Sequence, residues 1–284
     1  MPVRNADLKA LHEQAVLFRR EILETVHLAG SGHPGGSLSA VEIMIALYGY
    51  QLNHRPQEPL WPDRDRLIVS KGHCSPVTYV TLANYGYFPK AELKRFRKFG
   101  SILQGHVHVK VPGVEFNTGS LGHGLSVACG IALGAKMSKK SFNVYCLLGD
   151  GEIQEGSVWE AAMTAPHYHL DNLCAIVDYN KVQENGPVNQ IKNLEPLADK
   201  WKCFGWHAIE VDGHQLPALL KAFDEFAVID GKPTVIIAHT VKGKGVSFME
   251  GKAGWHGKAP NAEQLNAALA ELVALKSDKG AVNR

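Results

Sequence analysis

Apolar residues follow two patterns along this chain, a helical period and short continuous runs. The helical period is clearest over residues 8–26, which predict one long amphipathic helix that runs toward Gly30. Short runs rich in Val, Ile, Leu and aromatic residues predict strands, and these runs cover residues 67–69, 142–148, 173–177, 206–211 and 234–238. Because helical patterns separate the runs, we expect an α/β fold with a mostly parallel sheet and helices on both faces.

Further helices are expected over residues 76–85, 89–99, 121–137, 155–169, 216–227 and 262–275. Another should begin near Ser39, because Ser39 and Glu42 have the spacing of a capping box, and the glycine-rich segment 30–36 should separate it from the first helix. Residues 242–260 are rich in glycine and lysine and show little apolar pattern, so they predict a long functional loop. We expect residues 1–284 to form a single domain that closes with this loop and the helix over 262–275.

Small residues dominate the expected helix over 121–137. Glycine inside a helix costs about 1 kcal/mol, so this composition indicates close packing against another backbone. We therefore consider residues 119–137 a candidate interface helix, and the alternative is packing within the chain's own core.

The composition excludes several classes of partner. The 284 residues include 30 basic and 28 acidic side chains, a formal charge of +2, without a basic block that would bind nucleic acid or a membrane surface. The apolar runs are shorter than a membrane-spanning helix requires, and the N-terminus leads into a charged amphipathic pattern rather than a signal peptide. We therefore expect a soluble, cytoplasmic protein. Its five cysteines lack a Cys-x-x-Cys spacing and are expected to be reduced packing residues.

Two polar residues stand just beyond expected strands, thirty positions apart. Asp150 lies in a Gly-Asp-Gly turn after one strand-like run, and Asn180 follows the next. If a helical crossover joins these strands, the carboxylate and the amide meet at the carboxyl edge of the sheet, where open α/β sheets bind ligands. Together with the carbonyl of Val182 they would leave room on Mg²⁺ for phosphate oxygens and water. The alternative is an ordinary turn and an Asn that merely ends a strand.

Four of the histidines lie in glycine-rich loops, namely His33, His73, His106 and His256. Imidazole can donate or accept a hydrogen bond and can move a proton near neutral pH, which suits a substrate with several hydroxyl groups. The alternative for each is a scattered surface histidine. Zinc is a rival interpretation, with His106 and His108 as its candidate pair, although no helical His pair or Cys-His cluster accompanies them.

These segments resemble one family in order and spacing. The Gly-Asp-Gly motif with Asn about thirty residues later is similar to the signature of thiamine diphosphate enzymes, and nearly the whole chain looks like the N-terminal half of a transketolase. Six ordered motifs carry the resemblance: Gly30-Ser31-Gly32-His33-Pro34-Gly35, Ser70-Lys71-Gly72-His73, Gly105-His106, Thr118-Gly119-Ser120-Leu121-Gly122, Gly149-Asp150-Gly151-Glu152-Ile153-Gln154-Glu155-Gly156 and Trp255-His256-Gly257-Lys258. They imply the thiamine diphosphate-binding fold of the diphosphate-binding domain.

The resemblance also implies a role for each matching position. Mg²⁺, or another divalent cation such as Ca²⁺ or Mn²⁺, would be held by Asp150, Asn180 and the Val182 carbonyl. Thiamine diphosphate would be contacted by His73, Gly119, Leu121, Asp150, Gly151, Glu155, Asn180 and His256. The reacting end of the sugar would be surrounded by His33, His73, His106 and His256. An acidic network between active sites would include Glu155 and Glu160, and the loop lysines Lys242, Lys244 and Lys258 are expected to hold the closing loop against phosphate.

The implied activity is transfer of a two-carbon ketol unit from a ketose phosphate to an aldose phosphate. In transketolases, the Glu that activates the cofactor lies in a pyrimidine-binding domain further along the chain. Because this chain stops at Arg284, we expect that domain, and the basic groups that grip phosphate, to come from a C-terminal transketolase subunit in a heterotetramer with two copies of each chain.

Two positions depart from the family pattern. His123 stands where Gln is common, and Val107 stands where Pro is common. Residues beside the sugar channel select the substrate, so the donor and acceptor sugars stay open. It also stays open whether the enzyme belongs to the pentose phosphate pathway or to a specialised catabolic pathway. The alternative functions are a 1-deoxyxylulose 5-phosphate synthase-like or 2-oxo acid dehydrogenase α-like chain, and a non-catalytic regulatory half that has kept the fold.

Overall fold

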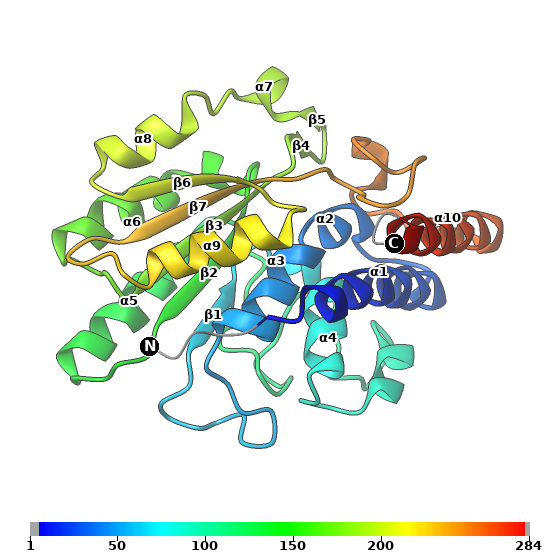
Figure 1. The fold of residues 1–284 in the computed structure, drawn as a ribbon, viewed down its shortest axis with the longest axis horizontal. Coiled ribbons are helices and arrows are strands. Elements are labelled where there is room, and N and C mark those ends of the chain that lie inside the picture. Colours follow the sequence, from blue (N-terminus) through cyan, green and yellow to red (C-terminus); the bar gives the residue numbers. More distant parts are fainter. Residues whose placement is uncertain (1–5, 282–284) are drawn as a thin grey trace.

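Five parallel strands form the central sheet of the computed structural model, which describes residues 6–281 and the side chains of residues 6–274 (Figure 1). In their order across the sheet, the strands are β1 (Arg66–Val69), β2 (Val144–Gly149), β3 (Leu173–Tyr179), β7 (Thr234–His239) and β6 (His207–Asp212). Every neighbouring pair in this order is parallel. A separate antiparallel hairpin is formed by β4 (Val182–Gln183) and β5 (Gly186–Pro187).

Helices cover both faces of the sheet (Figure 1). One face carries α1 (Leu8–Ala29), α2 (Pro34–Ser39), α3 (Val41–Ala46), α4 (Ser75–Asn84), α9 (Leu216–Phe226) and α10 (Ala262–Ala281). The other carries α5 (His123–Met137), α6 (Gly156–His167), α7 (Val188–Ile191) and α8 (Leu197–Cys203).

The sheet separates two hydrophobic cores. Along β2, Tyr145 and Leu147 belong to the core on the α1 face, whereas Cys146 and Leu148 belong to the core on the α5 face. Successive strand side chains point to opposite faces, so a strand that is buried on both faces must be apolar at every position. Burial on both faces therefore explains the continuous apolar runs in the sequence. The predicted α/β fold class is confirmed.

The first helix begins and ends as its sequence indicates. The Asp7 carboxylate accepts a hydrogen bond from the Ala10 N–H at 3.1 Å and caps the N-terminus of α1. The helix ends at Gly30, whose φ of 66° lies in the left-handed region that glycine adopts without a steric penalty. Pro34 then opens α2, since its ring fixes a helical φ where no N–H is needed.

The predicted capping box at Ser39 and Glu42 is wrong. Helix α2 ends at Ser39, and α3 starts at Val41 without a side-chain cap. The Ser39 hydroxyl donates to Asp178 at 2.6 Å, and the Glu42 carboxylate accepts from Arg19 at 2.7 Å. Both side chains are buried in tertiary contacts, which local spacing cannot distinguish from a cap.

Other element boundaries differ from the predictions. The expected helix over 89–99 is a short 3₁₀ helix, Lys90–Arg95, and α5 begins at His123 instead of 121. The chain after β3 forms the β4–β5 hairpin, α7 and α8, which the apolar pattern does not predict. Helix α10 continues to Ala281 instead of ending at 275, and the loop 242–260 contains one 3₁₀ turn, Ala253–Trp255.

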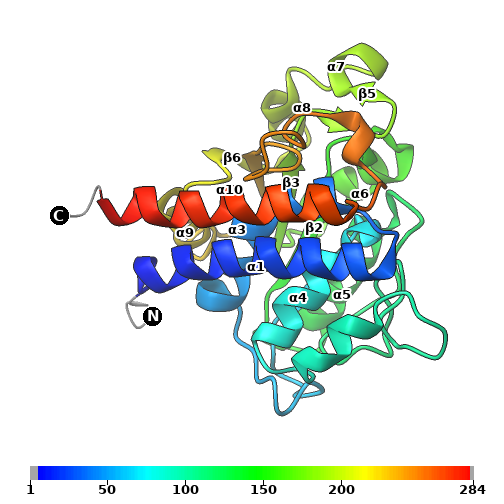
Figure 2. The ribbon, with the colours of Figure 1, turned by 90° about the vertical axis from the view of Figure 1, so that its right-hand side faces the viewer.

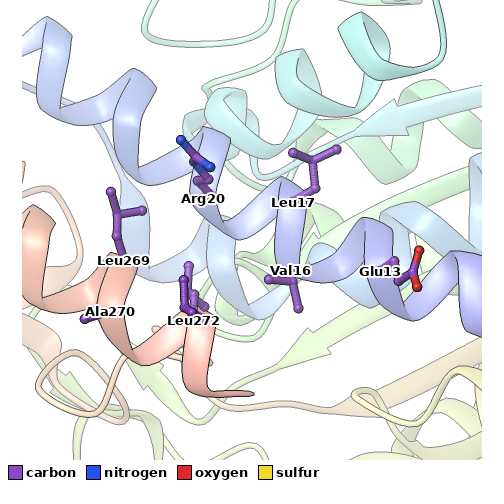
Figure 3. A pocket seen from close by; sticks show the side chains of 8 residues that line it. Glu13, Val16, Leu17, Arg20, Leu269, Ala270 and Leu272 are labelled. Carbon is purple, nitrogen blue, oxygen red and sulfur yellow. The ribbon is translucent and has the colours of Figure 1, made fainter. Parts of the chain in front are cut away.

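Helices α1 and α10 lie side by side and antiparallel (Figure 2). A groove of about 460 Å³ runs between them and is lined mainly by Val16, Leu17, Leu269 and Leu272, with Glu13 and Arg20 at its edges (Figure 3). Glu13 is the one carboxylate among these lining residues, and it does not converge with other polar groups suited to proton transfer or metal binding, so the groove is not a candidate reaction site. None of the helices within the described part of the chain is long and apolar enough to cross a membrane.

Candidate active site

The segments after β1, β2, β3 and β7 meet at the carboxyl edge of the sheet. Asp150 follows β2 directly, and Asn180 follows β3 directly. Gly149 and Asp178 are partners in the strand register, so the two predicted metal ligands leave neighbouring strands at nearly the same level. The structure therefore brings together the residues that the sequence paired.

Asp150 has a buried carboxylate, with only 3% of the residue exposed. One carboxylate oxygen accepts from the Gly151 N–H at 2.7 Å, and the other accepts from the Lys181 N–H. Burial, and then the nearby Asp178 carboxylate, raise the pKa of Asp150 to about 6. No ion pair to this carboxylate is found among the described side chains, so a cation beside Asp150 would relieve an unfavourable burial.

The other two predicted metal ligands are oxygens on the segment that follows β3. The Asn180 amide oxygen accepts from the Val182 N–H at 3.2 Å, and its amide nitrogen donates to Asp178 at 3.2 Å. The Val182 carbonyl accepts from Lys242 Nζ at 2.8 Å. A carboxylate, an amide and a carbonyl are the hard oxygen ligands that Mg²⁺ and Ca²⁺ prefer, so this set fits a divalent cation that also binds phosphate.

The four loop histidines form one cluster beside this edge. The ring centroids of His33 and His73 are 5.2 Å apart, those of His33 and His256 5.4 Å, and those of His73 and His256 5.1 Å. His106 is the exposed member, 6.2 Å from His33. The four histidines are therefore not scattered, although His106 does lie at the surface.

Burial and nearby positive charges favour the neutral form of all four histidines. Burial, and then the positive charge of Arg97, lower the pKa of His33 to about 4. Burial and the charge of Lys242 lower the pKa of His256 to about 3, and burial and Lys71 lower that of His73 well below its ordinary value. The pKa of His106 is lowered by burial and by Arg97. A neutral imidazole carries one N–H donor and one basic nitrogen, so the cluster can both donate to and accept from substrate hydroxyl groups.

Lys242 lies inside the site instead of on the surface of the loop. The residue is 2% exposed, and its ammonium group donates to the Val182 carbonyl and, at 2.9 Å, to Nδ1 of His256. Because Nδ1 accepts this bond, the proton of neutral His256 lies on Nε2. The other loop lysines lie elsewhere: Lys244 pairs with Glu250 at 3.3 Å, and Lys258 lies 5.2 Å from the centre of the Trp255 ring.

A buried ion pair beneath the site was missed by the sequence analysis. Asp178 and Lys71 are 0% and 2% exposed as side chains and pair directly. The Asp178 carboxylate also accepts from Ser39, Thr240 and Asn180. Burial alone would raise the pKa of Asp178, but the charge of Lys71 holds it below its ordinary value. This hub joins α2 and the ends of β1, β3 and β7, and it orients the Asn180 amide.

Glu152 ties the Gly-Asp-Gly turn to the segment that contains Leu121. Its carboxylate accepts from the Gly149 N–H at 2.9 Å, from the Gly122 N–H at 3.0 Å, and from the Ser70 hydroxyl. Leu121 is 38% exposed at this rim. The two residues of the predicted acidic network, Glu155 and Glu160, are both exposed. Glu155 directly precedes α6, and Glu160 lies within it.

Gly119 and Val107 hold His106 from two sides. A Cβ at Gly119 would stand 3.0 Å from the His106 ring, and Gly119 has a φ of 147°, so only glycine fits here without strain. The Val107 N–H donates to the Gly72 carbonyl at 3.2 Å and ties the His106 loop to the His73 loop. Proline, which is common in the family at this position, has no N–H and could not make this bond. His123, the second departure, is exposed at the start of α5.

A second buried network fixes the beginning of the loop over 242–260. Arg19 donates from its two terminal guanidinium nitrogens to the Glu42 carboxylate, at 2.7 and 2.8 Å, and from Nε to the Lys244 carbonyl at 2.9 Å. His214 donates through Nδ1 to Glu42 at 3.0 Å and accepts at Nε2 from the Val241 N–H at 2.9 Å. These contacts hold the segment on both sides of Lys242. Only the tertiary fold brings these residues together, so no local sequence signal would have found them.

The zinc interpretation gains no support from the geometry. In the part of the chain that the structure describes, no three His, Cys, Asp or Glu side chains are arranged to hold a metal ion. His108 instead accepts a hydrogen bond from the Lys110 N–H at 3.1 Å through its Nδ1.

Comparison with known proteins identifies similar chains. Residues 12–278 match the model of the transketolase family described as the thiamine diphosphate-binding domain. The chain is 43% identical to one of the subunits of apulose-4-phosphate transketolase from Phocaeicola vulgatus, over 93% of this chain and 94% of that protein. It is 44% identical to a 6-deoxy-6-sulfo-D-fructose transketolase subunit of a Clostridium species, over 92% of this chain and 96% of that one. Human transketolase is also 44% identical over 88% of this chain, but the match covers only 40% of that longer protein. The crystal structure of Campylobacter jejuni transketolase has a TM-score of 0.89 and 34% identity, over 93% of this chain and 43% of that one.

Proposed function

The chain belongs to the transketolase family, and on this premise we propose that it is the diphosphate-binding subunit of a two-chain transketolase. The enzyme would transfer a two-carbon ketol unit from a ketose phosphate to an aldose phosphate. One observation carries this proposal. The cluster of four neutral histidines directly adjoins the edge at which Asp150, Asn180 and Val182 present their oxygens. Cofactor site and substrate site are thus contiguous.

We further propose that the site binds thiamine diphosphate through Mg²⁺ or another divalent cation. Asp150, Asn180 and the Val182 carbonyl would hold the metal, and Gly151, His73 and His256 would contact the diphosphate. A Cβ at Gly151 would stand 2.9 Å from Cβ of Gln183, so glycine is the residue that fits beside Gln183 without a shift. When bound, the thiazolium ring supplies the carbanion and the electron sink that carbon–carbon bond cleavage needs.

The chain's own part in the reaction is to position the sugar and to move protons. His256 presents its N–H from Nε2, because Lys242 occupies Nδ1. At pH 7 a neutral imidazole can accept a hydrogen bond from a sugar hydroxyl, whereas its depressed pKa makes it a weak base in the unliganded site. A positioned proton transfer contributes roughly 10²- to 10⁴-fold when the pKa of the imidazole lies nearer 7. His33 lies between the other three rings and has a buried Nδ1 without a hydrogen-bond partner in the described chain, so it is available to a substrate oxygen.

The substrates we propose are sugars that end in a tetrahedral oxyanion. The name of one relative contains apulose 4-phosphate, and the name of another contains 6-deoxy-6-sulfofructose. The first sugar carries a phosphate and the second a sulfonate at one end of a polyhydroxylated chain. We infer that the donor of this enzyme carries such a group as well.

The partner we propose is a C-terminal transketolase subunit with the pyrimidine-binding domain, in a heterotetramer with two copies of each chain. The Phocaeicola vulgatus relative, which its name describes as one part of a transketolase, matches this chain over nearly its whole length, whereas human transketolase continues well beyond the matched part. We propose that the assembled enzyme acts in the cytoplasm and that residues 1–284 form one domain, since both described cores pack on a single sheet.

The outer face of α5 is our candidate surface for the partner. Ser126, Gly130 and Gly134 follow one another at intervals of four residues on this face and are exposed. A Cβ at Gly130 or Gly134 would meet nothing within 4 Å, whereas one at Gly124 would lie 2.8 Å from Cα of Ser70. Close packing inside the chain therefore explains Gly124 but not the other two glycines. Contact with a second backbone would explain them.

Alanine substitutions on α5 are expected to distinguish these glycines. Gly130→Ala and Gly134→Ala should each raise the unfolding free energy of the isolated chain by about 1 kcal/mol, because alanine favours the helix and its methyl group meets open space. The matched control Gly124→Ala should lower it, since Ser70 blocks the methyl group. Chemical denaturation measures both changes, and analytical ultracentrifugation with the partner should show weaker assembly for Gly130→Ala. Unimpaired assembly, even with Gly130→Leu, would rule out this face.

Native purification followed by an assay tests the proposed function. The complex purified from the source should contain a second chain in equal amount, and with thiamine diphosphate and Mg²⁺ it should transfer a ketol unit from a ketose phosphate to an aldose phosphate. Full transfer by the isolated chain would contradict the need for a partner. Consumption of pyruvate without ketol transfer would favour the synthase-like or dehydrogenase-like alternatives. Absence of cofactor binding beside the partner would favour a regulatory half.

A further inference from the structure

Arg97 lies beside the histidine cluster in a conformation that is unusual for a residue with a side chain. Its φ is 59°, in the left-handed region, which costs an arginine about 1 kcal/mol. Its N–H donates to the Leu103 carbonyl at 2.8 Å. The preceding residue, Phe96, is buried against Tyr79, with ring centroids 6.1 Å apart. The buried Phe96 ring and the hydrogen bond to Leu103 therefore hold the backbone in this turn.

The guanidinium group lies flat against the backbone at Gly105. A Cβ at Gly105 would stand 2.6 Å from one terminal guanidinium nitrogen, 2.7 Å from Nε and 2.9 Å from Cζ of Arg97. Gly105 immediately precedes His106. The absence of a side chain at this one position thus makes the space in which the Arg97 head group reaches the cluster.

The Arg97 side chain has an unmet capacity for hydrogen bonding. Its Nε is buried and has no acceptor within the described residues, and none of the ion pairs found there includes Arg97. A buried charged donor without a partner is costly and calls for an explanation, such as a ligand. Nδ1 of His33 is the other atom of this kind in the cluster.

The histidine cluster has a cationic side chain at each of two ends, Arg97 beside His106 and Lys242 beside His256. Burial is the main cause that lowers the pKa of all four histidines. Arg97 adds to it at His33 and His106, Lys71 adds to it at His73 and His256, and Lys242 adds to it at His33, His73 and His256. The lysine end adjoins Val182, because Lys242 binds the Val182 carbonyl. Arg97 and Lys242 thus lie beside different members of the cluster: Arg97 packs against Gly105, which precedes His106, and Lys242 binds His256, while the His33 ring lies 6.2 Å from that of His106 and 5.4 Å from that of His256. Two separate anionic groups can bind, one at each end, with the neutral histidines between them.

We propose that Arg97 is a substrate-binding residue that holds the terminal phosphate or sulfonate of the sugar and donates its Nε–H to one of the oxyanion oxygens. This inference rests on the proposed function. A planar guanidinium group matches a tetrahedral oxyanion with parallel N–H donors, which a lysine ammonium group cannot do. Diphosphate from the cofactor is the other source of such an oxyanion, but the residues predicted to contact it lie at the lysine end. Arg97 thus adds a contact from this chain to the basic groups that we expect from the partner.

The assembled complex, loaded with thiamine diphosphate and Mg²⁺, allows a direct test. With fructose 6-phosphate as donor, Arg97→Gln is expected to lower kcat/KM at least about tenfold, mainly through KM, because a charged hydrogen bond is lost. With unphosphorylated fructose, kcat/KM should change less than about twofold. Arg97→Lys should restore little, since it keeps the charge but not the planar fork.

Two matched variants separate this role from structural support. Gly105→Ala is expected to reproduce the selective loss, because its methyl group displaces the guanidinium group without changing any charge. Lys98→Gln removes one positive charge from the neighbouring exposed residue and should behave like the unaltered enzyme. Equal losses with both donors in the Arg97 and Gly105 variants would mean that Arg97 only supports His106, and would overturn the proposal.

Calorimetry gives a second measurement that does not depend on turnover. Inorganic phosphate titrated into the loaded complex should bind at least about tenfold more weakly to Arg97→Gln than to the unaltered protein, while the affinity for thiamine diphosphate stays the same. A fall in cofactor affinity would assign Arg97 to the diphosphate, and equal phosphate affinity in both proteins would also overturn the proposal. A complex that binds phosphate through Arg97 but transfers no ketol unit would refute the proposed function while leaving the oxyanion site in place.

Discussion

Replacing Asp150 by Asn is expected to weaken magnesium-dependent binding of thiamine diphosphate at least about a hundredfold. Loss of groups that only support metal ligands already costs about 10- to 100-fold, and Asp150 would bind the metal itself. The chain should remain folded. The carboxylate is buried and its pKa is raised to about 6, so a neutral amide of the same shape removes an unfavourable charge and gives up about one backbone hydrogen bond. Calorimetric titration of the complex with the cofactor, with and without Mg²⁺, measures the effect.

The control for Asp150→Asn is Asp199→Asn on α8, which makes the same chemical change on a side chain that is 66% exposed. It should leave cofactor affinity unchanged. An Asp150→Asn protein that still binds the cofactor as tightly, and only when Mg²⁺ is present, would place the metal at other residues.

Lys71→Met is expected to lower the unfolding free energy of the chain by about 3–5 kcal/mol, the largest effect on stability that we expect from one substitution at the site. The substitution leaves the fully buried Asp178 carboxylate without its cation, and the raised pKa of Asp150 shows that this region already holds one poorly compensated carboxylate. Chemical denaturation without cofactor isolates the effect from metal binding.

Two comparisons test the cause of this loss. Adding Asp178→Asn to Lys71→Met should recover part of the stability, because the unpaired charge is removed while the bonds to Ser39 and Thr240 can persist. Lys140→Met breaks an exposed pair with Asp63, whose side chains are 44% and 51% exposed, and should cost less than about 1 kcal/mol. A loss of similar size from Lys140→Met would mean that burial is not the cause.

The sequence predicted those parts of the site that are encoded by local order. Apolar runs located all five strands of the sheet, and the polar residues after two of them identified Asp150 and Asn180. Glycine-rich loops singled out the four histidines, which the fold then assembled into one cluster. These predictions succeeded because the residues that directly follow parallel strands come together at one edge of the sheet.

Parts of the site that depend on tertiary pairing could not be predicted in this way. Asp178 directly follows the predicted strand over 173–177, and nothing near it in sequence indicates that Lys71, more than a hundred residues earlier, neutralises it. Arg97 shows no signal either, because its position depends on a left-handed turn and on the absence of a side chain at Gly105. The predicted capping box failed for the same reason: Ser39 and Glu42 have the right spacing, but distant partners bind both side chains.

Because α1 packs on α10, the two faces of the sheet differ in how far apart in sequence their helices lie. The α5 face takes its helices from residues 123–203, so most of its cover is one continuous stretch of chain. The α1 face is completed only when the last helix packs on the first (Figure 2). Contacts between elements so far apart in sequence carry the largest loop-closure entropy, and they are slow to form. During synthesis on the ribosome, one core has all its helices once residue 203 has emerged, whereas the other must wait for α10.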